Sequence, residues 1–281
     1  MLIRSKGQII KDEIVTHGLL IFFSVIMIFP VALSLMTSFK TKTDVMILPP
    51  QFFPPTWTLE GYRKVFQSDL IPIYLPNSAI NSFAATILTV VLASFAAYGF
   101  SRFKFKGSRA LQMGILGLMM IPGVTNLVSY YKLGSQLGIL STHLIMILIY
   151  TGFELPFGLL ILKNFFDAIP IDLEEAAKID GCKSIQVLWH VIIPLSLPGV
   201  FVASLLILVY LWNEFLFAVT LLSANEARTA MVGLYDFQTS FEVAYHALSA
   251  ASIIVLIPML VIFLLGRKTF FHAMMEGALK G

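Results

Sequence analysis

Apolar residues run continuously, rather than in alternation with polar ones, through six long stretches of the chain. A helix rises ~1.5 Å per residue and the hydrocarbon core of a bilayer is ~30 Å thick, so each stretch is long enough to span it. Continuous apolarity favours helices over a β-barrel, whose strands alternate. The pattern predicts an all-α protein, a polytopic membrane bundle of six transmembrane helices. They are Val15–Ser38, Ser78–Phe100, Leu111–Tyr131, Thr142–Leu162, Gly199–Leu222 and Ala247–Leu265.

The composition agrees with this fold class. Hydrophobic residues make up 58% of the 281 residues and charged residues 12%, whereas a soluble domain carries about 25% charge. The net charge of +3 comes with no basic stripe, which argues against a nucleic-acid partner. The basic N-terminal head resembles a signal peptide, but the apolar run from Leu19 to Met36 is too long for one, so a retained first span is expected.

Lysine and arginine are concentrated in alternate connections between the stretches. One side holds 13 of the 19 basic residues. Because cytoplasmic loops are enriched in basic residues, both termini are predicted to be cytoplasmic. The basic residues on that side are Arg4, Lys6, Lys11, Arg102, Lys104, Lys106, Arg109, Lys163, Lys178, Lys183, Arg267, Lys268 and Lys280.

The outer connection after the first span is rich in proline. It contains six prolines, four of them within LPPQFFPPTW, which predicts an extended loop rather than a domain. The tail after the last span either packs on the bundle or a partner, or stays solvated. The predicted parts are a cytoplasmic N-terminus (1–14), the first span (15–38), the outer loop (39–77), a transmembrane core (78–266) containing a charged cytoplasmic loop (163–198), and a cytoplasmic tail (267–281).

The loop between the fourth and fifth stretches carries a short acidic segment. Asp172 can cap a helix, and Glu175 three residues later completes a capping-box pattern. Glu174 can pair with Lys178 one turn further on, and Gly181 can take the positive φ that ends the helix. Alanines on one face would let another surface approach closely.

A second helix is expected after Ser184, because apolar residues recur there at amphipathic spacing. Pro194 and Pro198 then stop or bend the chain before the fifth span. Physical chemistry alone leaves two interpretations: the helix pair packs on its own bundle, or it presents an acidic, alanine-faced surface to a partner. The apolar positions are Ile185, Leu188, Trp189 and Ile192.

Residues 175–194 resemble the EAA motif of ABC-importer permeases, Glu-Ala-Ala-x3-Gly-x9-Ile-x-Leu-Pro. In that family the first helix of this loop docks into a groove of an ATPase subunit. The resemblance implies that Glu175 pairs with a basic residue of the groove and that the small residues permit close contact. The departures are Val191 and Ile193, each apolar for apolar. The implied ATPase-coupling residues are Asp172, Glu174, Glu175, Ala176, Ala177, Asp180, Gly181 and Pro194.

The resemblance extends from about Leu75 to the C-terminus and is closest to six-span subunits of the carbohydrate-uptake subgroup. It implies a sugar or oligosaccharide importer of the bacterial inner membrane. The implied partners are a dimer of ATPase subunits, a second homologous permease and an extracytoplasmic solute-binding protein. The stretches that carry it are NSFAATILTVVLASFAAYGFSRFKFKG, MMIPGVTNLVSYYKLGSQLGILST, WNEFLFAVTLL and MMEGALKG.

Several functional classes lack their motifs. The chain contains no Gly-Lys pair and therefore no Gly-x4-Gly-Lys-Ser/Thr phosphate loop, so ATP hydrolysis is expected on a separate polypeptide, with no cofactor bound here. The five histidines are scattered without a His-Glu-x-x-His grouping, so neither a metal site nor catalytic residues are predicted. The single cysteine, Cys182, excludes an internal disulfide framework.

Polar side chains within the predicted spans are candidates for function, because an ionisable group in the bilayer centre costs ~3 kcal/mol or more. They could line a translocation path, where aromatic faces stack on sugar rings and carboxylates accept hydroxyl bonds. They could equally bond across helices and hold the bundle together. The candidates are Asn126, Glu154, Tyr210, Trp212, Asn213 and Glu214.

A stand-alone transporter driven by an ion gradient is the alternative. Such a protein is expected to show internal inverted repeats and broken helices. Neither is visible in the sequence, which favours the importer subunit.

Overall fold

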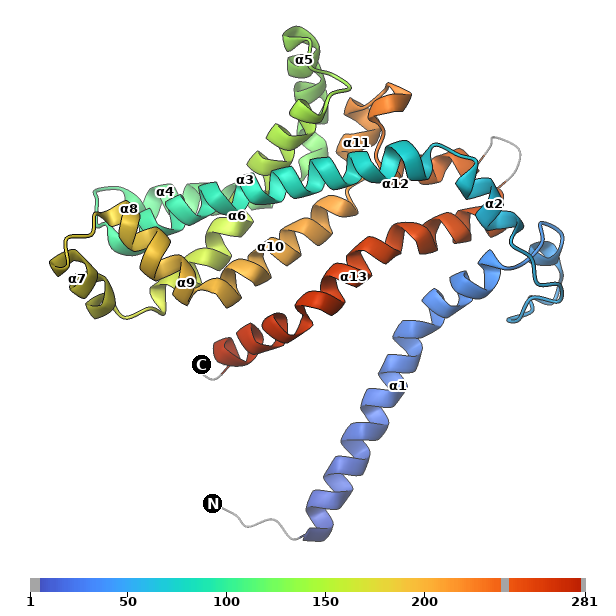
Figure 1. Ribbon diagram of the computed structural model, residues 1–281, viewed down its shortest axis with the longest axis horizontal. Coiled ribbons are helices and arrows are strands. Elements are labelled where there is room, and N and C mark those ends of the chain that lie inside the picture. Colours follow the sequence, from blue (N-terminus) through green and yellow to red (C-terminus); the bar gives the residue numbers. More distant parts are fainter. Residues whose placement is uncertain (1–5, 239–242, 279–281) are drawn as a thin grey trace. The chain divides into compact units, whose positions relative to one another are not determined.

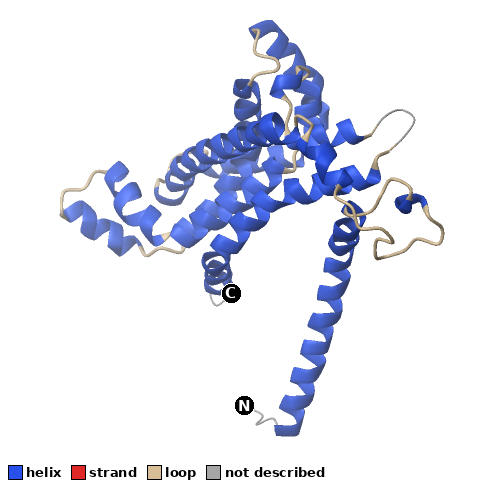
Figure 2. Ribbon diagram, turned by 45° about the vertical axis from the view of Figure 1, so that its right-hand side comes forward, coloured by secondary structure: helices blue, strands red, loops and turns tan. Residues whose placement is uncertain are grey.

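The computed structural model describes residues 6–238 and 243–278, which are helical apart from their loops and an isolated bridge between Gln238 and Val243 (Figures 1 and 2). The chain forms two compact units, Met1–Ser68 with Leu234–Leu256, and Asp69–Gly233 with Ile257–Gly281. The predicted all-α membrane fold class is confirmed.

Among the described residues, four helices are long and apolar enough to cross a membrane. Two further helix pairs have the necessary length and apolarity together but are sharply bent, so the chain has up to six spans if each pair counts as one. The four are α1 (Lys6–Ser38), α3 (Leu75–Arg102, continuing a helical turn over Leu70–Tyr74), α6 (His143–Asp167) and α13 (Tyr245–Ala278).

The predicted third span, Leu111–Tyr131, is not one straight helix. Helix α4 (Ser108–Gly117) and a short turn end at Met120, and α5 (Leu127–Leu137) follows at an angle of 91°. Pro122 explains the break, because proline lacks the N–H that continues a helix and drives the residue before it into extended backbone. Ile121 accordingly has ψ of 117°.

The predicted fifth span, Gly199–Leu222, is also interrupted. Helix α10 (Leu197–Trp212) ends before residues 213–215, and α11 (Leu216–Leu221) starts again after them. At its other end, α10 bends by 82° from the helical segment Ser184–Leu195, which contains α8 (Ser184–Val187) and α9 (Ile193–Leu195).

The helices extend beyond the predicted ends of the spans. Helix α1 begins at Lys6 within the predicted N-terminal segment, and α13 continues through the predicted tail to Ala278. The outer loop at 39–77 is irregular only in its first part, because α2 (Glu60–Phe66) and the turn before α3 lie in its second part. Residues 1–5 and 279–281 of the predicted terminal segments lie outside the described residues.

The unit built on Met1–Ser68 shows two kinds of helix surface. The apolar window of α1 has no buried residue, which suits a helix surrounded by lipid. In contrast, α2 lies close to the start of α13: a Cβ at Gly61 would lie 2.6 Å from the His246 carbonyl oxygen. The Lys64 ammonium also lies 3.3 Å from His246 Nε2.

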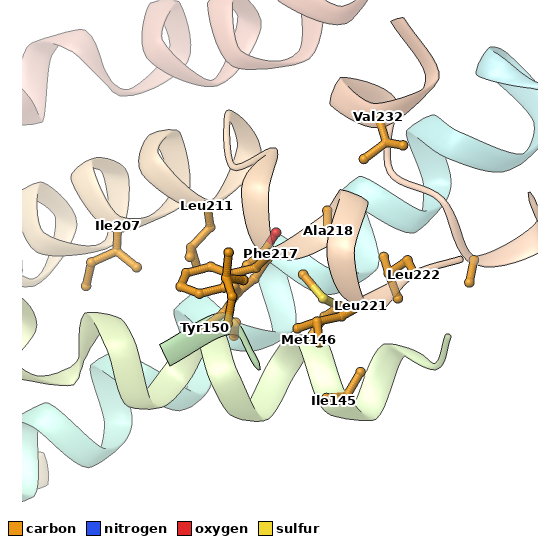
Figure 3. Packing of buried hydrophobic residues seen from close by; sticks show 13 residues of the cluster. Ile145, Met146, Tyr150, Ile207, Leu211, Phe217, Ala218, Leu221, Leu222 and Val232 are labelled. Atoms are coloured by element: carbon orange, nitrogen blue, oxygen red, sulfur yellow. The ribbon is translucent and has the colours of Figure 1, made fainter. Parts of the chain in front are cut away.

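The core of the other unit is a bundle of α3, α6 and α10 (Figure 1). Small residues let α3 and α6 approach closely, as is common between membrane helices. A Cβ added to Gly158 of α6 would lie 3.1 Å from Cβ of Ala93 on α3, and Ala85, Ala93 and Ala97 are fully buried. Where α10 ends, larger side chains fill the core around Tyr150 and Phe217 (Figure 3).

The start of α3 fixes the chain that follows α11. Asn77 Nδ2 donates to the carbonyl oxygens of Glu226 and Arg228 at 2.8 and 2.9 Å. The backbone N–H of Ala230, the first residue of α12 (Ala230–Gly233), donates to Ser78 Oγ at 2.8 Å. These contacts hold the irregular connection against the bundle.

Candidate functional site

The acidic loop forms the predicted surface helix, α7 (Ile171–Ile179), but Asp172 is not its cap. The N-cap is Pro170, which makes no side-chain cap bond and has ψ of 135°. The helix therefore begins at Ile171, two residues earlier than a cap at Asp172 would place it, and Pro170 is tolerated there because its missing N–H is not needed at a helix start. Asp172 is exposed in the first turn, where its charge complements the helix dipole.

The predicted end of the helix is confirmed. Gly181 has φ of +90°, and its N–H donates to the Lys178 carbonyl at 3.0 Å, while Cys182 N–H donates to the Ala177 carbonyl at 3.0 Å. These bonds satisfy carbonyls that the helix end would leave without partners. A side chain at Gly181 would meet no atom of this chain within 4 Å, so the glycine is required here by backbone conformation alone.

Much of α7 is exposed, including large apolar side chains. Ile179 is 86% exposed, and Ile171 and Leu173 are about half exposed. Glu175 and Ala176 are exposed beside them, whereas Ala177 is half-buried and packs against a core cluster of the bundle. The EAA residues therefore lie partly on an outward-facing apolar and acidic surface and partly against the protein itself.

Glu174 faces the bundle and does not form the predicted pair with Lys178. Its carboxylate accepts a hydrogen bond from Arg102 Nε at the end of α3 and one from the Tyr98 hydroxyl at 3.3 Å. The side chains of Arg102 and Glu174 are 8% and 1% exposed. The prediction was wrong because a local i,i+4 pair is weak, whereas a buried carboxylate requires a charged partner from the bundle.

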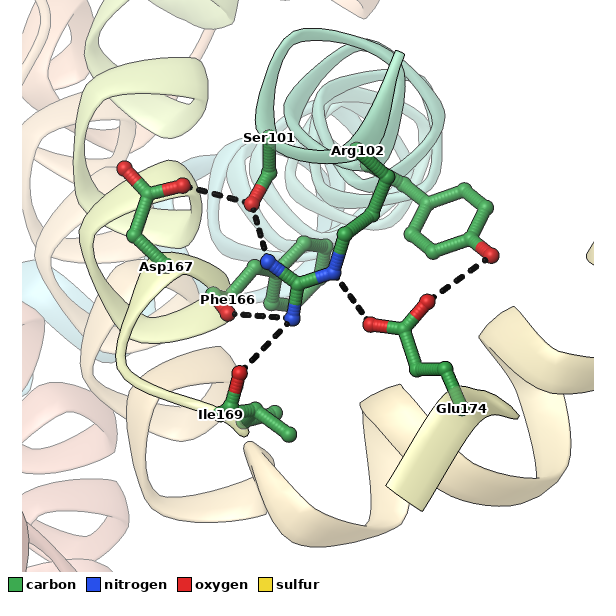
Figure 4. A network of polar contacts seen from close by, with 7 residues as sticks. Ser101, Arg102, Phe166, Asp167, Ile169 and Glu174 are labelled. Carbon is green, nitrogen blue, oxygen red and sulfur yellow. Dashed lines mark hydrogen bonds and ion pairs between the residues drawn. The ribbon is translucent and has the colours of Figure 1, made fainter. Parts of the chain in front are cut away.

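Arg102 connects three elements (Figure 4). Besides Glu174 of α7, its guanidinium donates to the carbonyl oxygens of Phe166 at 2.8 Å and Ile169 at 3.0 Å, at the end of α6. It also donates to Ser101 Oγ at 2.8 Å, and that hydroxyl donates to Asp167 at 2.5 Å. Arginine suits this position because its donors diverge in a fixed plane.

The second helical segment differs from the predicted amphipathic stripe. Val187, Leu188 and Ile192 are buried, whereas Ile185 and Trp189 are 55% and 43% exposed. A helical turn wider than an α-turn over Leu188–Ile192 shifts the periodicity and explains the difference. Pro194, the last residue of the EAA motif, is exposed in the first turn of α9.

A cavity of about 470 Å³ lies between α5, α6, α10 and the helical turn that follows α4, Leu118–Met120. It contains three of the predicted path residues: Asn126 at the start of α5, Glu154 in the middle of α6 and Tyr210 near the end of α10. Tyr210 stacks on Phe153 with ring centroids 6.0 Å apart. None of the lining residues is basic. They are Leu118, Met119, Ile121, Asn126, Tyr130, Gly152, Phe153, Glu154, Pro156, Phe157, Leu206 and Tyr210.

The other three predicted path residues are not among those lining this cavity. Trp212 is buried in the core, and the Asn213 side chain donates to the Val209 carbonyl at 2.7 Å. Glu214 accepts the backbone N–H of Phe217 at 2.7 Å and of Ala218 at 3.1 Å, and the Tyr150 hydroxyl at 2.8 Å. Glu214 therefore caps α11 and ties it to α6.

The sequence did not point to the contact between Arg102, Tyr98 and Glu174, nor to Tyr130, Phe153 and Phe157 in the cavity lining. In the sequence, Arg102 is one of the basic residues that predict orientation. A basic residue in the last turn of a span does not indicate which acidic residue of a distant loop will be its partner.

Among the described residues, no group of histidine, cysteine and carboxylate side chains has the arrangement of a metal site.

The fold and these sites define a polytopic membrane protein with a cavity among its helices and a surface helix fixed to its bundle. The family described as "Binding-protein-dependent transport system inner membrane component" matches residues 89–269, more than half of the chain. The chain belongs to this family of transporter permeases.

Curated relatives cover nearly the whole chain. The "Sulfoquinovosyl glycerol transport system permease protein SmoH" of Agrobacterium fabrum is 34% identical over 254 residues, covering 90% of this chain and 89% of the relative. The "Trehalose/maltose transport system permease protein MalG" of Thermococcus litoralis is 34% identical over 278 residues, covering 96% and 99%.

Solved structures share the fold. A chain of a bacterial ABC transporter involved in the import of the acidic polysaccharide alginate superposes with a TM-score of 0.79 at 21% identity, covering 96% of this chain and 100% of that one. A chain of the MetNI methionine ABC transporter in an inward-facing conformation gives 0.52 at 18% identity, covering 71% and 95%.

Proposed function

We propose that this chain is a permease subunit of an ATP-driven ABC importer of a sugar or oligosaccharide, and that α7 couples ATP hydrolysis to transport. Two relatives are named for the transport of sugar-containing solutes, sulfoquinovosyl glycerol and trehalose or maltose. Both relatives are permease proteins, and the two alignments cover 90% and 96% of this chain. The chain has no phosphate loop, so the hydrolysis belongs to separate subunits.

The outward surface of α7 is the observation that carries the coupling role. Ile171, Glu175 and Ile179 follow one another at four-residue spacing on one face of α7, and all three are exposed in the described chain. A row of exposed apolar side chains with a charged residue between them fits a protein partner better than open water. An ATPase subunit with a groove and a basic residue opposite Glu175 would bury this surface.

The proposed assembly contains two ATPase copies, a second homologous permease and an extracytoplasmic solute-binding protein. It lies in the bacterial inner membrane with both termini of this chain and α7 in the cytoplasm, as the distribution of basic residues predicts. The cavity lined by Asn126, Glu154 and Tyr210 is the part of the solute path that this subunit contributes. Its aromatic walls suit the faces of sugar rings, and Glu154 can accept hydroxyl bonds.

Family membership favours this function over the ion-coupled alternative. The expectation that the helices are unbroken was wrong, since two of the predicted spans are interrupted. Broken helices therefore do not separate the two hypotheses, and the turn after α4 contributes Leu118 and Met119 to the cavity lining.

The test is purification in mild detergent after co-expression with the genomic neighbours. A nucleotide-binding subunit and a second permease should be recovered with the tagged chain. Glu175→Lys should abolish recovery of the ATPase, because it places like charges in the groove. The matched control is Glu226→Lys, which reverses another exposed charge, on the connection after α11, and should leave the ATPase bound. Retention of the ATPase by the Glu175 variant would refute docking at α7.

A further inference from the structure

Glu174 is buried, unlike the other charged residues in and directly after α7. It is 1% exposed, while Asp172, Glu175, Lys178 and Asp180 are exposed. The carboxylate points away from the surface that would meet a partner and toward the ends of α3 and α6 (Figure 4). A role in direct contact with an ATPase subunit does not fit this burial.

The Arg102 guanidinium that holds Glu174 makes four hydrogen bonds. Arg102 directs Nε to the carboxylate, one terminal nitrogen to Ser101 Oγ and the other to the carbonyl oxygens of Phe166 and Ile169. The two carbonyls lie at the end of α6 and in the turn that leads into α7. One side chain therefore joins the last turn of α3, the last turn of α6 and the surface helix.

This connection is stiff for electrostatic reasons. Separating a buried ion pair leaves a charge without compensation in a medium of low dielectric constant, which is unfavourable. The carbonyls at a helix end attract a cation as well, and the Tyr98 hydroxyl occupies the second oxygen of Glu174. A movement of α7 away from the bundle must break these bonds together, so small movements are passed on to α3 and α6.

The route leads to the cavity. The end of α6 that Arg102 contacts contains Phe166 and Asp167. The same helix contains Phe157, Glu154 and Phe153, which line the cavity. From Phe166 to Phe157 is ~14 Å along a continuous helix. A displacement imposed at one end of α6 therefore reaches the aromatic wall of the cavity without an intervening loop.

We infer that Arg102 and Glu174, with Tyr98, form a clamp that transmits movement of α7 to α3 and α6, so that they act as positioning residues for transport rather than as ATPase contacts. The inference rests on the proposed function, since it assigns a linkage within the same coupling helix. It assigns Glu174 a different role from Glu175: Glu175 binds the partner, and Glu174 passes the partner's movement to the membrane helices.

The test uses the complete importer, reconstituted in vesicles with its solute-binding protein. Glu174→Ala should retain the ATPase subunits and basal ATP hydrolysis, but uptake and the stimulation of hydrolysis by the loaded binding protein should fall about tenfold, a typical size for coupling between sites. Glu174→Gln keeps one oxygen for Arg102 and should lie between Glu174→Ala and the unchanged protein. Lys104→Gln removes an exposed charge just after the end of α3, outside the contacts of Arg102 and Glu174, and should leave stimulation unchanged.

A second variant separates transmission from folding. Replacing both Arg102 and Glu174 by Met removes the charges together, a change that buried pairs often tolerate in stability. The assembled double variant should also lose stimulation while retaining the ATPase.

Normal stimulated hydrolysis in Glu174→Ala or in the double variant would overturn the clamp. Loss of the ATPase from Glu174→Ala would overturn it as well, because Glu174 would then serve docking. The Glu175→Lys variant tests the docking proposal separately. If the ATPase stays bound to that variant, the docking proposal fails, whatever the result for the clamp.

Discussion

Glu154 and Glu214 are two carboxylates in the same apolar bundle with different surroundings. Glu214 accepts two backbone N–H groups and the Tyr150 hydroxyl, which satisfies the start of α11. Glu154 lies against the cavity among aromatic side chains. The first arrangement stabilises the fold, whereas Glu154, which is 5% exposed, lines the cavity that we propose as part of the solute path.

We predict that Glu214→Ala lowers the thermal stability of the purified complex by about 1–2 kcal/mol, since the amides of Phe217 and Ala218 lose their acceptor. Glu154→Gln should leave the melting temperature unchanged and reduce uptake. Thermal unfolding in detergent and vesicle uptake measure the two effects. Equal melting temperatures for Glu214→Ala and the unchanged protein would show that the cap has no energetic role.

Gly181 supports a second prediction at the level of single residues. Gly181 and Gly107 both have positive φ, of +90° and +86°, and an added Cβ meets nothing within 4 Å at either position. Leucine at either site should therefore impose a similar backbone strain of ~1–2 kcal/mol. Only Gly181→Leu should abolish uptake, by obstructing the close approach of the ATPase. Equal uptake by the two variants would assign the glycine a backbone role only.

At the scale of elements, what the sequence could predict depends on whether the determining contacts are local. The end of α7 at Gly181 depends on one residue's backbone freedom, and the long helices depend on runs of apolar residues, so both were predictable. The side of α7 that Glu174 occupies depends on Arg102, 72 residues away. The break after Trp212 likewise depends on Glu214 meeting Tyr150 of α6, and no local pattern contains that contact.

The packing of α3 on α6 leads to a prediction about an element pair. Gly158→Leu should destabilise the complex by about 1–3 kcal/mol, because the new side chain meets Ala93 and Ile207 in a closely packed seam. Gly152 lies on the same helix with no atom within 4 Å of an added Cβ, so Gly152→Leu is the matched control and should be tolerated. Denaturation of both variants in the same detergent compares them. A stable Gly158→Leu complex would mean that the helices can separate at little cost.

At the scale of the whole molecule, the bent helix pairs determine which side of the membrane each loop occupies. Three predicted spans separate the outer loop at 39–77 from the α7–α8 connection, and one of them is the bent pair α4–α5. If the pair crosses the membrane, the two loops lie on opposite sides. If it enters and returns on one side, they lie on the same side.

Cys182, the single cysteine, lies in the α7–α8 connection and is half-buried. We predict that a membrane-impermeant maleimide labels it in inside-out vesicles and not in right-side-out ones. Leu48→Cys, at a position 84% exposed, should show the reverse in a Cys182→Ser background. Because Cys182 is half-buried, it could escape the reagent on either side. Ile179→Cys in the same background is the control, since position 179 is 86% exposed. Labelling of both loops from one side would make α4–α5 re-entrant, and labelling of Cys182 only from outside would place α7 beyond the reach of a cytoplasmic ATPase.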